Sequence, residues 1–357
     1  MFRSTPAVSV VVPAYNGERT ILRTLDSIIS QKYRPLQIVV VNDGSQDSTA
    51  SLIGDFAEKN NEKADFVFFQ HERNLGLSRS LNDGIEKAQG NHVLVLHQDC
   101  ELMDEHWVEK ALRLMKDEKV AVVTGYYGIS DVEDETFVKR AFGVLRKQFH
   151  ARPKCSCEEA TFSEGKCDLY KKELLKKVGG FPVDYRIAGE DLIVSYKLRR
   201  LGYSIVKCYD LPVIQRFSGA AESIQGNLGK EFTFGKAMGG VFSEFKLFLF
   251  KAVNNSNYSG SRSLHRSSQP IFVLSLLLAA VFTFFAWWVI LLVIGLLAYR
   301  LLYYFFRVYP EIRGGYKKVK HAILESIAAS VFGLLSDFFY TFGFAYGLLR
   351  HALGRRL

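Results

Sequence analysis

Several features that mark common cofactor and metal proteins are missing from this chain of 357 residues. No G-x-G-x-x-G fingerprint follows the first apolar run, which argues against a nicotinamide cofactor. The five cysteines include no C-x-x-C pair, and we interpret them as free thiols rather than zinc ligands or a disulfide framework. No cleavable signal peptide is visible, because the N-terminus leads directly into a short strand-like run.

Long apolar runs are present near the C-terminus. Residues 271–306 carry one charged side chain, Arg300, so this stretch is too long and too apolar for a soluble core helix. We predict a transmembrane hairpin of two helices over residues 270–307, with one long tilted helix as the alternative. The basic residues within 307–321 indicate the cytoplasmic side. Residues 1–230 are then cytoplasmic, and we expect a multi-pass protein of the cell membrane.

Two further segments flank this predicted hairpin. Residues 231–269 predict an interfacial amphipathic helix and a polar linker, although an ordinary packed helix has the same spacing. Residues 308–357 contain a basic loop and an apolar stretch that carries Glu325 and Asp337, and this stretch either spans the membrane or lies in its interface. The formal net charge of +9 thus belongs largely to segments beside the membrane, and we expect no nucleic-acid partner.

The first 125 residues or so alternate strand-like and helix-like patterns. Apolar runs such as "AVSVVVPAYN" and "LQIVVVNDGS" are followed by segments of helical periodicity such as "ERTILRTLDSIISQ". This alternation predicts an α/β domain with a mostly parallel sheet and helices on both faces. Ligands of such sheets bind at the carboxyl ends of the strands. The polar residues that close the runs are therefore the candidates for a site.

The order and content of several blocks resemble a family 2 glycosyltransferase, an inverting enzyme with the GT-A fold. The blocks are "VVVPAYNGERTILRTLDSIISQ", "IVVVNDGSQDST", "NLGLSRSLNDGIEKAQG" and "GGFPVDYRIAGEDLIVSYKLRRLGYSI". The resemblance implies a Rossmann-like GT-A domain over residues 1–230 and a nucleotide-sugar donor. The apolar C-terminal segments suggest a membrane-attached member of the family.

The resemblance assigns nucleotide binding to the ends of the first strands. Asp43 suits this role, because a carboxylate can accept the ring N–H of a base. Its alternative is a turn acid in "NDGS", where Asn, Asp and Gly favour tight turns. The nucleotide-binding candidates are Ala14, Tyr15, Asn16, Glu18, Asp43 and Asn74.

The segment "LHQDC" occupies the place of the family's Asp-x-Asp block, whose carboxylates bind a divalent cation. His97 stands at the first acid's place and Asp99 at the second, and Gln215 stands where many members have a histidine. We expect Mn²⁺ or Mg²⁺ at Asp99, since hard cations prefer oxygen ligands. His97 either adds a nitrogen ligand, which would suit Mn²⁺, or is a hydrogen-bonded histidine at a strand end.

Inverting transfer needs a base for the acceptor hydroxyl. By resemblance, Asp191 is this base and Glu190 supports the acceptor or the loop. The alternative is that two acids at a helix N-terminus only favour the helix dipole. Gln215 and Arg216 are candidates for contact with the diphosphate or the acceptor, although a surface arginine is equally plausible at position 216.

The expected function is transfer of a sugar from a nucleotide-diphosphate donor to a lipid-linked or cell-surface glycan. None of the three tryptophans stands in a Gln-x-x-Arg-Trp block, so we expect one sugar per encounter rather than processive synthesis. Residues 126–170 are expected to form an acceptor-side insertion. Two alternatives stay open: transfer directly to a polyprenyl phosphate, and a non-catalytic nucleotide-binding scaffold.

Overall fold

The computed structural model describes residues 7–129, 156–184, 189–216, 223–245, 269–279, 289–314 and 319–353. The chain divides into two compact units, and the described residues up to 216 belong to the first while those from 223 onward belong to the second. The predicted domain boundary at residue 230 stays a prediction, although the first helix of the second unit already begins at Ile224.

The first unit contains one nine-stranded sheet with the order β3-β2-β1-β4-β8-β6-β9-β5, and β7 pairs with β9 off this path. Strands β1 to β4 pair in parallel. The bounds of the strands are β1 (Val8–Ala14), β2 (Leu36–Asn42), β3 (Asp65–Gln70), β4 (His92–Leu96), β5 (Cys100–Leu102), β6 (Val120–Ile129), β7 (Cys157–Ala160), β8 (Cys167–Lys171) and β9 (Ser204–Gln215).

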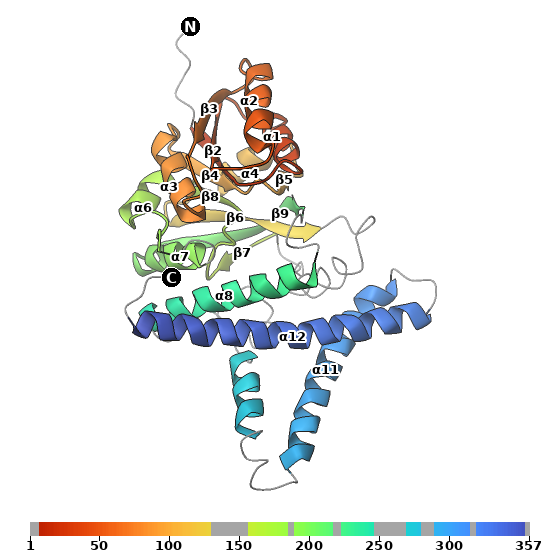
Figure 1. Cartoon of the computed structure of the whole chain (residues 1–357). Coiled ribbons are helices and arrows are strands. Elements are labelled where there is room, and N and C mark those ends of the chain that lie inside the picture. Colours follow the sequence, from red (N-terminus) through yellow and green to blue (C-terminus); the bar gives the residue numbers. More distant parts are fainter. Residues whose placement is uncertain are drawn as a thin grey trace. The chain divides into compact units, whose positions relative to one another are not determined.

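Helices cover both faces of this sheet (Figure 1). Successive residues of a strand point to opposite faces, so Val10 and Val12 pack with α1, α2 and α4 on one face, whereas Val11 packs with α3, α6 and α7 on the other. Their bounds are α1 (Ile21–Ile29), α2 (Thr49–Lys59), α3 (Leu77–Lys87), α4 (Trp107–Leu114), α6 (Lys172–Lys177) and α7 (Glu190–Arg200).

The predicted α/β class is confirmed, with one difference in the sheet. Strand β8 runs antiparallel to β4 and β6, and β9 runs antiparallel to β5 and β7. The sheet is therefore mixed rather than mostly parallel, because the regular βα alternation ends after β4. Strands β7 and β8 also show that residues 157–160 and 167–171 of the predicted acceptor-side insertion belong to the sheet, and residues 130–155 lie outside the described residues.

The second unit consists of helices in its described residues. They are α8 (Ile224–Phe245), an unlabelled helix (Gln269–Ala279), α11 (Val289–Gly314) and α12 (Val319–Ala352). Two stretches, Leu291–Pro310 and Ala322–Ala352, are long and apolar enough to cross a membrane by length and composition. The prediction that residues 270–307 form a hairpin with two membrane crossings is not tested by this arrangement and stays a prediction.

Helices α8 and α12 lie side by side (Figure 1) and meet through glycines. A Cβ atom on Gly235 would lie 2.0 Å from the carbonyl oxygen of Tyr340, and one on Gly343 would lie 2.0 Å from that of Phe232. Small residues spaced four apart, here also Gly239 and Gly347, allow such close helix contact. The predicted helix after residue 230 is thus packed along its length against α12.

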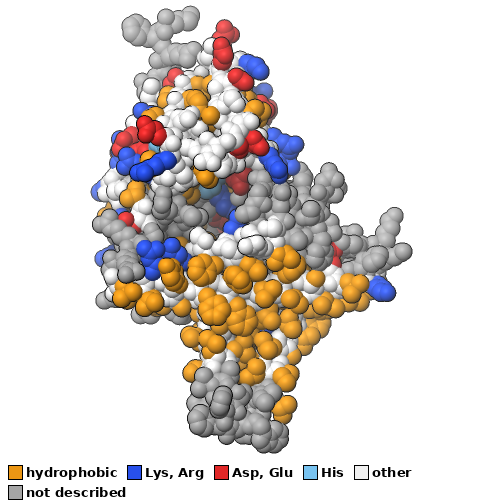
Figure 2. Space-filling view, viewed as in Figure 1, with side chains coloured by type: hydrophobic (Ala, Val, Ile, Leu, Met, Phe, Trp, Pro, Cys, Tyr) orange, Lys and Arg blue, Asp and Glu red, His pale blue; other side chains and the backbone are white. Residues whose placement is uncertain are grey.

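Another face of α12 is apolar and exposed. The exposed residues recur every three or four positions, which places most of them on one face of the helix. They are Val319, Ile323, Leu324, Ile327, Val331, Leu335, Phe339, Phe342, Tyr346 and Leu349. Figure 2 shows hydrophobic side chains gathered over the helices of this unit.

One buried polar group joins three of these helices. Asp337 of α12 is fully buried, and its carboxylate accepts hydrogen bonds from Arg300 Nε at 2.7 Å, Tyr304 Oη at 2.7 Å and Gln269 Nε2 at 2.8 Å. The charges that the sequence placed inside two separate apolar stretches, Arg300 and Asp337, therefore neutralise each other. Such pairing is how ionisable groups persist in apolar surroundings.

Candidate active site

The predicted site residues of the first unit lie at one end of the strands of its sheet, and we call this end the site edge. The carboxyl ends of β1, β2 and β4 meet there because these strands are parallel neighbours. Strand β8 is antiparallel to β4, so its amino end, which follows Lys166, lies at the same edge. The carboxyl end of β9 reaches it as well, because Gln215 pairs with Cys100 of β5.

The loop after β1 is bound to the loop after β4 by a single amide side chain. Gln98 Oε1 accepts the backbone N–H of Tyr15 at 2.9 Å, and Gln98 Nε2 donates to the carbonyl oxygen of Tyr15 at 2.9 Å. This close approach requires Gly17, because a Cβ atom there would lie 2.1 Å from Gln98 Oε1. The Tyr15 side chain itself is 42% exposed, and Ala14 is the last residue of β1.

The same loop is also bound to the loop after β2. Asn16 has φ of 47°; its N–H donates to Ser45 Oγ at 2.9 Å, and its Oδ1 accepts the N–H of Gln46 at 2.9 Å. Glu18 Oε2 accepts the N–H of Ser48 at 3.1 Å. Asn16 and Glu18 therefore link the loop after β1 to the loop after β2, and their contact with a nucleotide stays a prediction.

Asp43 is buried, at 4% exposure, and most of its acceptor capacity is in use. Its carboxylate accepts the N–H groups of Leu75 at 2.8 Å and Gly76 at 2.9 Å, and His71 Nδ1 lies 2.7 Å from Oδ1. A carboxylate has about four acceptor positions, so little remains for a base. The structure gives Asp43 a part in holding the loop before α3, and contact with the donor stays a prediction.

Asn74 lies in that same loop and is exposed. The loop passes close to the turn after β2, because a Cβ atom on Gly44, whose φ is 69°, would lie 2.8 Å from the backbone nitrogen of Asn74. Asn74 therefore lies beside the turn that contains Asp43, and its contact with a nucleotide stays a prediction.

Asp99 is half-buried and engaged on one side by an amide. Gln215 Nε2 donates to Asp99 Oδ2 at 2.9 Å, and the other end of the same amide, Oε1, accepts from Lys166 Nζ at 2.7 Å. The three side chains thus form a chain in the order Asp99, Gln215, Lys166. Lys166 was not among the sequence candidates, since a lone lysine before a strand carries no recognisable pattern.

A divalent cation fits this group through one protein oxygen. Asp99 Oδ1 lies 3.7 Å from the thiol of Cys100, whereas the oxygen of Gln215 is turned to Lys166. Burial lowers the pKa of His97 to about 4, and its Nε2 is buried without a hydrogen-bond partner in the described part of the chain. Within the described ranges, no three His, Cys, Asp or Glu side chains gather as a metal site. The remaining ligands would come from donor phosphates and water, as is common for Mg²⁺.

Glu190 and Asp191 begin α7 and face a third acid. Burial raises the pKa of Glu190 to about 7, and burial together with the charge of Glu190 raises that of Asp191 well above its usual range. Burial also raises the pKa of Asp168 to about 6. Asp191 lies against Gly165, whose added Cβ would be 3.1 Å from Asp191 Oδ2. Three neighbouring carboxyl groups with raised pKa values are unusual outside functional sites.

The side chain of Arg216 is half-buried and forms an ion pair. Its Nε donates to Glu101 Oε1 at 2.5 Å, and its backbone N–H donates to the carbonyl oxygen of Asp99 at 2.7 Å. The guanidinium is therefore paired with a carboxylate of β5. A contact of Arg216 with diphosphate stays a prediction.

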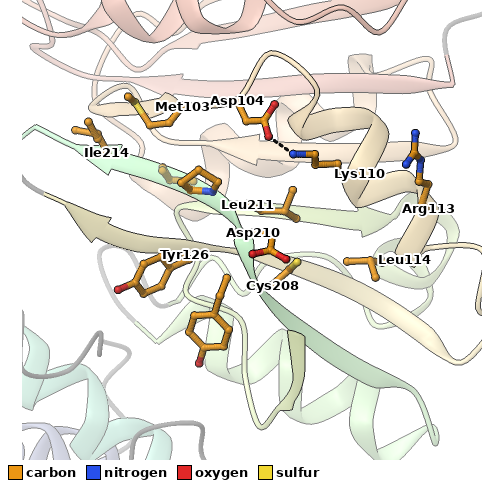
Figure 3. Close-up of a pocket in the computed structure, with 13 residues that line it drawn as sticks. Met103, Asp104, Lys110, Arg113, Leu114, Tyr126, Cys208, Asp210, Leu211 and Ile214 are labelled. Atoms are coloured by element: carbon orange, nitrogen blue, oxygen red, sulfur yellow. Dashed lines mark hydrogen bonds and ion pairs between the residues drawn. The ribbon is translucent and has the colours of Figure 1, made fainter. Parts of the chain in front are cut away.

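A separate cavity of about 700 Å³ lies in the first unit between α4, β6 and β9. Its wall is largely apolar and contains the ion pair of Asp104 with Lys110 (Figure 3). None of the site residues predicted from the sequence lines it. The cavity is therefore distinct from the edge that carries Asp99 and Asp191.

A mixed α/β sheet whose strand ends carry a braced loop pair, an aspartate after β4 and acids at the start of α7 is typical of the GT-A fold. Residues 9–179 match the family model described as Glycosyl transferase family 2, so this part of the chain is a domain of that family. The predicted recognition is confirmed.

Relatives agree with this assignment. A poly-beta-1,6-N-acetyl-D-glucosamine synthase of Staphylococcus epidermidis is 31% identical over 204 residues, which are 56% of this chain and 47% of the synthase. Glycosyltransferase GlyA of Streptococcus pneumoniae is 32% identical over 127 residues, which are 35% of this chain and 18% of the relative. The chain thus spans about half the length of the synthase and a smaller share of GlyA.

A solved structure shows the same fold. The mannosyltransferase PcManGT from Pyrobaculum calidifontis, in complex with GDP-Man and Mn²⁺, aligns with a TM-score of 0.54 and 20% identity over 93% of this chain and 88% of the other. At this identity the likeness concerns the fold alone.

Proposed function

We propose that this protein is a membrane-attached inverting glycosyltransferase that moves a sugar from a nucleoside diphosphate donor to a hydroxyl of a lipid-linked or cell-surface glycan. The observation that carries the proposal is the acid group of Asp191, Glu190 and Asp168, with raised pKa values, in a family 2 domain. A carboxylate whose pKa lies near or above neutrality is a stronger base than an ordinary one.

In the proposed reaction, ionised Asp191 accepts the proton of the acceptor hydroxyl. The acceptor oxygen forms a bond to the anomeric carbon while the bond from that carbon to the diphosphate oxygen breaks, and the leaving group keeps the electron pair. Burial raises the pKa values of both Glu190 and Asp191, and the charge of Glu190 raises that of Asp191 further. One sugar per encounter remains a prediction from the sequence.

The donor is proposed to bind across the braced loops after β1 and β2. The exposed ring of Tyr15 can stack on a base, since aromatic rings favour stacked contacts. Asp99 would hold a divalent cation, and such a cation, when bound, offsets charge on the departing diphosphate.

Membrane attachment is proposed to involve the whole second unit. Helix α12 has 34 residues, which is about 51 Å, whereas the hydrocarbon core is about 30 Å thick. Its partner α8 carries Lys230, Glu231 and Lys236, which would be costly to bury in lipid. The pair therefore suits the interface plane, with the exposed apolar face of α12 in lipid, and the helices 269–279 and 289–314 enter the bilayer.

The experiment that tests the catalytic role compares Asp191→Asn with Asp55→Asn, an exposed acid of α2. Donor nucleotide binding, measured by calorimetry, should be unchanged in both, whereas sugar transfer should be lost only in Asp191→Asn. Full transfer by Asp191→Asn would exclude the base. It would point instead to a polyprenyl phosphate acceptor, which is already ionised.

The in-plane position of α12 is tested with cysteines introduced at Lys320 and Arg350, near its two ends. Both should react with a membrane-impermeant maleimide from the side that carries the catalytic domain, above the background given by the native thiols. Labelling from opposite sides would show that α12 crosses the bilayer.

A further inference from the structure

The lysine before β8 occupies a central place in the site that the proposed mechanism has not yet used. Lys166 is fixed at the sheet edge by its backbone, because its carbonyl oxygen accepts the N–H of His97 at 2.9 Å. Next to it, Gly165 contacts the Asp191 carboxyl group. Lys166 therefore lies between the segment that contains Asp99 and the start of α7.

The ammonium of Lys166 is oriented by one amide and retains donor capacity. Gln215 Oε1 accepts one of its protons at 2.7 Å, while the nitrogen of the same amide is bound to Asp99. An ammonium group has three N–H donors. The side chain is half-buried, so the remaining donors can reach a ligand in a site that is partly shielded from water.

The direction of the displacement places an anionic group near this ammonium. In an in-line displacement the base and the leaving group stand on opposite sides of the anomeric carbon. With Asp191 as the base, the leaving diphosphate is directed toward Asp99 and Lys166.

We infer that Lys166 binds the donor diphosphate and stabilises its charge as it departs, with Gln215 acting as the positioning residue that holds the ammonium beside Asp99. This inference rests on the proposed function. Gln215 stands in place of the expected metal-binding histidine, and its side-chain oxygen binds the Lys166 ammonium rather than a metal ion. An ammonium supplies a point charge for phosphate, as lysines do in other phosphate sites.

The test measures binding of UDP and GDP, and of uridine and guanosine, to the full-length detergent-purified protein by calorimetry in the presence of EDTA. The variants are Lys166→Met, Lys166→Arg and, as a matched control, Lys116→Met at an exposed position. We expect Lys166→Met to weaken diphosphate binding about tenfold or more, as loss of a charge-assisted hydrogen bond does. Nucleoside binding should stay the same, and Lys166→Arg should keep most of the diphosphate affinity.

Thermal unfolding of each variant shows whether it is folded, and Lys166→Arg retains the charge if the methionine variant is not. Diphosphate binding by Lys166→Met that equals the wild type would overturn the inference while leaving the proposed function intact. If the wild type binds diphosphate only with Mn²⁺, the variants are compared in Mn²⁺, and diphosphate binding by Lys166→Met that equals the wild type there would overturn the inference as well. If the wild type binds neither diphosphate with EDTA or with Mn²⁺, the proposed function fails together with the inference.

Discussion

The rate of sugar transfer should rise steeply through neutral pH. Burial raises the pKa of Glu190 to about 7 and raises that of Asp191 further above its usual value. For a group with a pKa of about 7, the ionised fraction is about 0.09 at pH 6 and about 0.91 at pH 8. If transfer needs this ionisation, kcat/KM increases about tenfold between these pH values, and the midpoint belongs to the coupled pair.

The substitution Glu190→Gln separates this explanation from a general pH effect. The charge of Glu190 raises the pKa of Asp191, so its removal should move the midpoint of the kcat/KM profile to lower pH. The matched control is Glu173→Gln at an exposed position in the first turn of α6, which should leave the midpoint unchanged. A profile that is flat from pH 6 to pH 8, or a midpoint that Glu190→Gln does not move, would refute the reasoning.

The remaining predictions concern stability. The folded-state pKa of Glu190 lies above its unfolded value of 4.5, so the folded protein binds the proton more tightly, and the unfolding temperature of the purified protein should fall as pH rises from about 4.5 through about 7. Gly343→Ala should lower the unfolding temperature, because the added methyl group meets the carbonyl oxygen of Phe232. Gly295→Ala is the control and should not lower it, since a Cβ atom there meets nothing within 4 Å. Equal effects of the two substitutions would contradict the close contact of α8 with α12. Asp337→Ala should destabilise by about 3 to 5 kcal/mol, because it removes the carboxylate that neutralises the buried charge of Arg300. The double variant Asp337→Leu with Arg300→Met should recover most of this loss, and an additive loss in the double variant would show that the pair is not coupled.

The sequence predicted the strand-then-helix order of the first unit because buried parallel strands leave a strong pattern. The continuous apolar run of β1 and the periodicity of α1 can each be recognised without a partner. The antiparallel position of β8 could not be predicted in this way, because it depends on which strand lies beside β4. Local pattern contains no information about that choice.

The site residues were predictable to a similar degree. Asp99, Glu190 and Asp191 stand in recognisable blocks, whereas Lys166 and Asp168 become site residues only through the pairing of β8 with β4. The many bonds of Asp43 to the loop before α3 were equally hidden, since Leu75 and Gly76 are remote in sequence.

Gln98 occupies the middle position of the block after β4, a place where family patterns allow any residue. In this protein it forms a two-way amide contact with the backbone of Tyr15, while the adjoining loop is braced by Asn16 and Glu18 against the turn after β2. The three loops are thus linked to one another by hydrogen bonds. An attempt to change donor preference by exchanging a single loop with that of a relative would sever contacts on both sides, so the loops after β1, β2 and β4 would have to be transplanted together.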